Sequence, residues 1–190
     1  MPLNHSGLHR VWLFLAVAIF AGFIACAKPA TLKKNYTTSP GITLLAPGFA
    51  VNGSVPKSAT CEGANFSPAV SWTGFPSGTK GWALVLVDRS SQNFVHWLVY
   101  GINPDVRGLP QHLAHQAKLS SGVKQGRNSY GKIGYSGPCP PPGPEHIYQL
   151  TLYALNAKLN IPSGMQYREL FHALRGHILA QTSLQARFSR

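Results

Sequence analysis

The 190-residue sequence predicts a mostly β fold, an antiparallel β-sandwich with one C-terminal helix. Two observations carry this prediction. Short apolar segments rich in β-branched and aromatic residues recur between Gly- and Pro-containing turns, which is typical of strands. A helical period of apolar residues occurs late in the chain, after residue 163. Several strands followed by one helix indicate a two-sheet sandwich with helical decoration.

The chain begins with a predicted secretory signal peptide over residues 1–26. A short basic flank precedes residues 11–25, an apolar run that is too short to span a membrane comfortably and that ends in small residues. Residues 25–27, Ala-Cys-Ala, fit ordinary signal cleavage. Residues 23–26, Phe-Ile-Ala-Cys, instead resemble a lipobox in which Cys26 becomes the lipidated first residue, with Phe in place of the usual Leu.

Both cleavage patterns predict an exported protein, either free in the periplasm or anchored as a lipoprotein in a bacterial envelope. Residues 27–40 are interpreted as a tether, and residues 41–190 as one domain with its own core.

The predicted strands of the domain are short apolar runs bounded by turn signals. Residues 81–87 are almost continuously apolar and β-branched, which indicates a central strand buried on both faces. Residues 110–130 are polar and show no period, so they are interpreted as a long connection. The complete set of strands predicted before the helix is 42–45, 49–51, 69–72, 81–87, 96–102 and 147–155.

The C-terminal segment predicts the helix. Ser163 precedes Gln166 by three residues, a capping-box pattern for a helix start. Leu170, Leu174 and Ile178 then recur every four residues, which predicts one amphipathic helix over residues 164–181. Alternating apolar residues at 184–188 predict a last short strand.

The loop of residues 134–148 is the most informative stretch for function. Its prolines and glycines favour neither a helix nor a central strand. It ends in His146 and Tyr148, which share one face of the strand that follows. A rigid loop that brings two polar rings to the rim of a sheet is typical of a ligand site, although a structural turn with an incidental histidine is the alternative.

Three polar residues mark the ends of apolar strands: Asp88, His96 and His146. Asp88 is one of only two aspartates in the chain, and it could hold a histidine in one tautomer and keep it basic or cationic. A cationic imidazole, the Tyr148 hydroxyl and loop amides would suit a phosphate-like anion. The alternatives are that His96 is a satisfied core histidine and that Asp88 begins a turn.

Taken together, these motifs resemble the phosphatidylethanolamine-binding protein family, in its bacterial, Raf-kinase-inhibitor-like branch. The resemblance covers about residues 42–188, and its last segment is expected in the terminal helix. The segments that carry it are residues 60–68 with Trp72, 74–80, Asp88, 96–100, 134–148 and 176–180.

The resemblance implies a β-sandwich with a small anion pocket at one end, which binds phosphate-like groups including phospholipid head groups and has no established catalytic role. It implies no cofactor and no metal. By motif position, Ser136 lies on the rim and Cys139 occupies a place where some relatives have a small residue. The residues implied to bind the ligand are Asp88, His96, Gly137, Cys139, His146 and Tyr148.

Two departures from the family pattern place the ligand preference in doubt. Residues 88–91, Asp-Arg-Ser-Ser, stand where the family has Asp-Pro-Asp-Ala-Pro, so the rim near Arg89 should be more cationic. Ile147 replaces the arginine of the usual His-Arg-Tyr but leaves both pocket residues in place.

Composition limits the partners. Seventeen basic residues face five acidic ones, which favours anions and anionic membrane surfaces. The basic residues are scattered, so a dedicated nucleic-acid surface is not expected. Cys61 and Cys139 could form a disulfide in an oxidising compartment, but the sequence does not show whether they lie within bridging distance.

The sequence therefore predicts an exported, non-enzymatic protein that binds a phosphate-like anion or a phospholipid head group. The alternative is a protein-interaction module, such as a protease or kinase-pathway inhibitor. Two enzymatic alternatives are weaker, because the spacing matches no known motif. They are a metal site of Asp88, His96 and His146, and a Cys139 nucleophile with His146 as its base.

Overall fold

The computed structural model describes residues 41–47, 49 and 53–190. The predicted signal peptide, the lipidation site at Cys26 and the tether lie outside the described residues. So does most of the predicted strand 49–51. Among the described residues, no helix has the length and apolar character that crossing a membrane requires.

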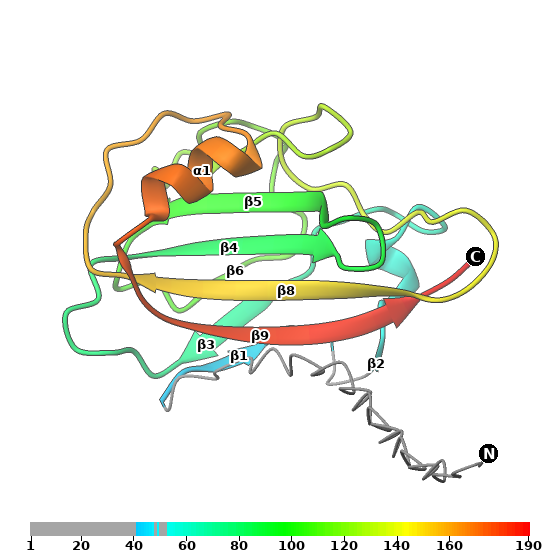
Figure 1. The fold of residues 1–190 in the computed structure, drawn as a ribbon, viewed down its shortest axis with the longest axis horizontal. Coiled ribbons are helices and arrows are strands. Elements are labelled where there is room, and N and C mark those ends of the chain that lie inside the picture. Colours follow the sequence, from blue (N-terminus) through cyan, green and yellow to red (C-terminus); the bar gives the residue numbers. More distant parts are fainter. Residues whose placement is uncertain (1–40, 48, 50–52) are drawn as a thin grey trace, which may run out of the picture. The chain divides into compact units, whose positions relative to one another are not determined.

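The larger sheet has six strands, and the order across it is β2-β9-β8-β4-β5-β7 (Figure 1). Neighbouring strands run antiparallel, except that β2 pairs in parallel with β9. The strands are β2 (Gly53–Ser54), β9 (Ile178–Phe188), β8 (His146–Leu155), β4 (Gly81–Asp88), β5 (Phe94–Ile102) and β7 (Lys124–Gln125).

A second sheet of three strands has the order β1-β3-β6, all antiparallel. Its strands are β1 (Thr43–Leu45), β3 (Val70–Thr73) and β6 (Gly108–Leu109). The helical elements are η1 (Lys57–Ala59) and α1 (Tyr167–Leu174). The prediction of a mostly β fold with one α-helix is therefore confirmed among the described residues.

The core explains why β4 is apolar up to Asp88 at its end. Leu84 and Leu86 point to one face of the large sheet, where they pack in a cluster with Trp72 of β3. Val85 points to the other face and packs in a cluster with Leu170 of α1. Every residue of β4 is buried, as predicted for a central strand covered on both sides.

The predicted C-terminal helix is wrong at both ends. Helix α1 spans only eight residues, and its capping box joins Gln166 and Glu169 rather than beginning at Ser163. The helix ends because Arg175 is extended and Gly176 has a φ of 79°. Ile178 does not continue the apolar stripe of the helix but begins β9.

Strand β9 is eleven residues long and pairs with β8 along nearly its whole length. The short strand predicted at residues 184–188 is its second half. Residues 176–180, which the family resemblance placed in the helix, lie in the turn after α1 and at the start of β9.

The connection over residues 110–130 is more structured than its composition predicts. It contains β7, and the side chain of Gln125 is buried with both its oxygen and its nitrogen hydrogen-bonded. Its Oε1 accepts a bond from Trp97 Nε1 at 2.9 Å, and its Nε2 donates to the carbonyl oxygens of Ala114 and Gln116. One buried amide therefore fixes the connection to the edge of the large sheet.

Candidate functional site

The candidate site lies at one end of the central strands of the large sheet, where β4 ends and β5 and β8 begin (Figure 1, right-hand side). Antiparallel pairing brings these ends together, because Asp88 is in register with Phe94 on one side and with Tyr148 on the other. His96 lies two residues after Phe94 on β5, and His146 lies two residues before Tyr148 on β8. Residues that are 58 positions apart, Asp88 and His146, are thereby placed in contact.

Asp88 and His146 form the closest polar contact of the site. The Nδ1 atom of His146 lies 2.6 Å from Oδ2 of Asp88, and the two side chains are 20% and 6% exposed. The other carboxylate oxygen accepts a hydrogen bond from the backbone N–H of Ser90 at 2.8 Å. A carboxylate at Nδ1 holds the proton on that nitrogen, which leaves Nε2 of His146 for a ligand.

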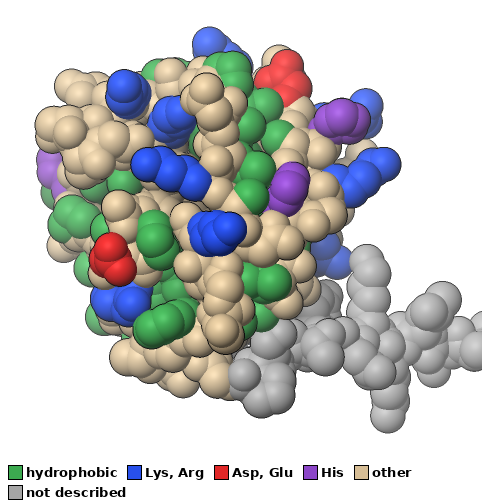
Figure 2. All heavy atoms as spheres, turned by 90° about the vertical axis from the view of Figure 1, so that its left-hand side faces the viewer, with side chains coloured by type: hydrophobic (Ala, Val, Ile, Leu, Met, Phe, Trp, Pro, Cys, Tyr) green, Lys and Arg blue, Asp and Glu red, His purple; other side chains and the backbone are tan. Residues whose placement is uncertain are grey.

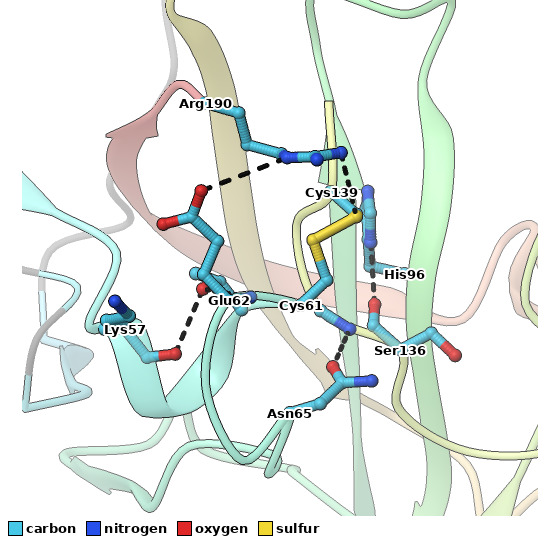
Figure 3. Close-up of a disulfide and its surroundings, with 10 residues drawn as sticks. Lys57, Cys61, Glu62, Asn65, His96, Ser136, Cys139 and Arg190 are labelled. Carbon is cyan, nitrogen blue, oxygen red and sulfur yellow. Dashed lines mark hydrogen bonds and ion pairs between the residues drawn. A yellow bond between two sulfur atoms is a disulfide. The ribbon is translucent and has the colours of Figure 1, made fainter. Parts of the chain in front are cut away.

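His96 is buried and is oriented by the backbone of the Pro- and Gly-rich loop. Its Nδ1 lies 2.7 Å from the carbonyl oxygen of Ser136, which can only accept, so Nδ1 carries a hydrogen (Figure 3). Burial lowers the pKa of His96, and the bond to Ser136 opposes that shift. The ring is therefore neutral at pH 7 in the absence of a ligand.

Tyr148 lies between the two histidines and is fully buried. Its ring makes an edge contact with His96 at 5.3 Å and is nearly parallel to His146 at 6.4 Å. Burial raises the pKa of Tyr148, and the charge of Asp88 raises it further. The hydroxyl therefore stays protonated and can donate a hydrogen bond.

The loop beside these residues is held by a second segment, residues 57–67. A disulfide joins Cys61 and Cys139 with Cα atoms 5.4 Å apart (Figure 3). The N–H of Cys61 also donates to the carbonyl of Pro138. The side chain of Arg190 lies over this bond, with Nη1 3.8 Å from Sγ of Cys139. Arg190 thus adds a cation beside the disulfide.

Gly137 has a structural part in this arrangement. Its N–H donates to Oδ1 of Asn65 at 2.7 Å, so this amide is already used and is not available to an anion. A Cβ atom at residue 137 would lie only 2.2 Å from the carbonyl oxygen of Ala59, which explains the glycine. The backbone amide of Gly137 is therefore not among the loop amides that could bind an anion.

The structure bears on both enzymatic alternatives. The sulfur of Cys139 is bonded to Cys61, so it has no thiol to act as a nucleophile. Over residues 41–47, 49 and 53–190, no three His, Cys, Asp or Glu side chains are grouped as a metal ion would require.

Sequence reasoning missed two aromatic residues beside His96. The ring centroid of His96 lies 5.3 Å from that of Phe94 and 6.0 Å from that of Tyr130. The rings of Phe94 and Tyr130 are in edge contact, with their centroids 4.8 Å apart. Strand alternation could have found Phe94, because it is two residues before His96 and shares its face. Tyr130 follows Ser129, which exchanges two hydrogen bonds with the backbone of Val95. These bonds hold the connection against β5 at this point.

The loop is also anchored from the side of the connection. The side-chain amide of Asn128, which is buried, donates to the carbonyl of Gly134 and to the hydroxyl of Ser136, both at 3.0 Å. Ser136, expected on the rim, is itself buried. The site thus consists of two imidazoles, a phenol and a carboxylate in a rigid frame, a set that offers several hydrogen-bond donors to a ligand.

Comparison with known proteins gives a consistent result. Residues 46–189 match the family model described as phosphatidylethanolamine-binding protein. A protein of Methanothermobacter thermautotrophicus named UPF0098 protein is 37% identical over 144 residues, which cover 75% of this chain and 95% of the relative. A UPF0098 protein of Aquifex aeolicus is 36% identical over 140 residues, 72% of this chain and 81% of the relative.

Two solved structures share the fold. A putative phosphatidylethanolamine-binding protein homolog of Chlamydia trachomatis superposes with a TM-score of 0.71 at 30% identity, over 80% of this chain and 99% of that one. YbcL of Escherichia coli, titled a new member of the mammalian family, superposes with a TM-score of 0.72 at 28% identity, over 79% and 99%.

Proposed function

Because the chain belongs to the phosphatidylethanolamine-binding protein family, we propose that it is an exported, non-enzymatic protein that binds a phosphate-like anion, either free or as the head group of a phospholipid. The observation that carries the proposal is the convergence of His96, His146 and Tyr148 at one edge of the sheet, with the Asp88 carboxylate 2.6 Å from His146.

The charge balance of the site favours a singly charged ligand. Asp88 and His146 are in direct contact, so the carboxylate offsets positive charge on that side of the site. Protonation of His96 then leaves one positive charge, which a phosphodiester or a phosphate monoanion would neutralise. The nearby carboxylate repels a second negative charge, so we expect modest affinity and a preference for monoanions.

The disulfide supports the proposed compartment. Cystines persist in oxidising environments such as the periplasm and are rare where thiols are kept reduced. The bond between Cys61 and Cys139 therefore agrees with export by the predicted signal peptide, whether the protein is released or is anchored at Cys26.

The test is calorimetric titration of the purified mature protein with inorganic phosphate and with O-phosphoethanolamine at mildly acidic pH. The double variant His96→Ala/His146→Ala should lose at least about tenfold in affinity, since a hydrogen bond to a charged group contributes about 1.5–3 kcal/mol. Binding of vesicles that contain phosphatidylethanolamine, but not of free phosphate, would identify the lipid as the source of the head group.

The control is His172→Ala/His177→Ala, which removes one histidine of α1 and one in the turn that follows it and should bind as the wild type does. If the wild type binds none of these probes, or if the two double variants bind equally, the anion-binding proposal is wrong. The alternative of a protein-interaction module would then have to be pursued.

A further inference from the structure

A cavity of about 700 Å³ lies at the opposite end of the large sheet from the candidate site. Its walls come from the start of β4, the end of β5 and the loops at residues 103–105, 121–124 and 155–161. The eight residues of β4 place it on the order of 20 Å from Asp88. Figure 2 looks at this end of the molecule and shows basic side chains among hydrophobic ones, with few acidic side chains.

The cavity has a positive wall. Lys80, Lys124 and Lys158 line it, and Asp105 is the single carboxylate among the lining residues. None of the three lysines forms an ion pair with another described residue. Lys124 is fixed, because its ammonium group donates to the carbonyl oxygen of Ile161 at 2.6 Å. An anion entering the cavity would therefore meet three ammonium groups against one carboxylate, with none of the three held in an ion pair among the described residues.

The remaining lining is largely apolar. Leu159 and Ile161 are half-buried and offer apolar surface to the cavity, and the almost fully buried residues Trp82, Ile102 and Leu155 also line it. The indole N–H of Trp82 is already bonded to the carbonyl oxygen of Pro104. The uncharged polar side chains of the lining are Thr79, Asn103, Ser121 and Asn160. An aliphatic chain that lies against Leu159 and Ile161 would bury apolar area.

We propose that this cavity binds a single-chain aliphatic carboxylate, an anionic amphiphile. The carboxylate lies near Lys80 and Lys158 at the opening, and the chain lies against Leu159 and Ile161. A volume of about 700 Å³ is within the usual range for small-molecule sites. This second site is separate from the proposed anion site and does not depend on it, since none of its lining residues belongs to that site.

The probe is sodium decanoate, titrated below its micelle concentration onto ¹⁵N-labelled mature protein and followed by chemical shifts. Saturable shifts are expected at residues 101–105, 121–124 and 155–161. Affinity should rise from hexanoate to octanoate to decanoate by up to about fourfold per added CH₂. The uncharged 1-decanol should bind more weakly than decanoate.

Charge reversal at the opening tests the lysines. Lys80→Glu/Lys158→Glu should weaken decanoate binding by at least about tenfold, because two attractions become repulsions. The matched control is Lys57→Glu/Lys132→Glu, which makes the same change in net charge at two exposed lysines outside the cavity and should bind within about twofold of the wild type. His146→Ala should also bind decanoate normally.

Four results would overturn the proposal: shifts that do not saturate, shifts centred on the Asp88 end of the sheet, decanol binding as well as decanoate, or equal weakening by both lysine variants. The last result would show general attraction to a basic protein rather than a site. Because His146→Ala removes a residue of the other site only, failure here is distinguishable from failure of the proposed function.

Discussion

At the scale of single residues, the protonation of His96 decides when the candidate site is cationic. Burial places the pKa of His96 below its ordinary value, so the unliganded ring is neutral near pH 7. A bound anion stabilises the cation and raises this pKa. Binding therefore takes up a proton, and affinity should increase as the pH falls toward the pKa of the free protein.

Proton uptake can be measured by titrating phosphate calorimetrically in buffers that differ in ionisation enthalpy. The wild type should take up a fraction of a proton at pH 7, and His96→Gln should take up less. Proton release on binding, or the same uptake in both proteins, would contradict the assignment of His96 as the group that is protonated.

At the scale of elements, Gly176 separates α1 from β9. Its φ of 79° is in the left-handed region, and a Cβ atom there would meet no other atom within 4 Å, so strain alone should decide the effect of substitution. Gly176→Ala should lower the free energy of unfolding by about 1 kcal/mol, measured by urea denaturation. Gly176→Asn should retain most of the stability, because Asn tolerates this conformation. If Gly176→Ala were stabilising, residues around 176 would be helical, as the sequence pattern predicts.

The elements also show where sequence reasoning succeeds and where it fails. Strands β4 and β8 could be predicted, because continuous or alternating burial leaves a direct pattern in the sequence. The helix was predicted too long, because Ile178 keeps the four-residue spacing while a single left-handed glycine ends the helix. Apolar spacing alone does not report a backbone conformation that only one residue adopts.

Some residues of the candidate site could likewise be predicted from the sequence, and others could not. Asp88, His96 and His146 stand at strand ends, and antiparallel pairing of adjacent strands brings such ends together, so their contact could be expected. Tyr130 and Asn128 belong to a connection without periodicity, and long-range bonds to Val95 and Ser136 place them. Their positions depend on tertiary structure that no local pattern encodes.

At the scale of the whole molecule, the family predicted from the sequence is confirmed. The disulfide links two distant segments of this fold. The two cysteines are 78 residues apart, and closing a loop of that length destabilises the unfolded chain by about 4.5 kcal/mol in the chain-entropy account. Cys61→Ser/Cys139→Ser should therefore unfold at a markedly lower urea concentration than the oxidised wild type.

Reductant provides the control for this comparison. It should lower the unfolding midpoint of the wild type toward that of the double variant and leave the variant unchanged. A wild type whose midpoint does not respond to reductant would show that the bond contributes little to stability.

The same cystine has a consequence for how the protein meets proteases. The bond joins Cys61 to Cys139, and between them lies the exposed turn of residues 120–121, a surface turn of the kind that proteases cut. A chain cut there keeps both fragments covalently attached, and β4, β5 and β8 keep their pairing. A nicked molecule would migrate as one species without thiol and as two with it, and it could outlast its first cleavage with the Asp88–His146 contact intact.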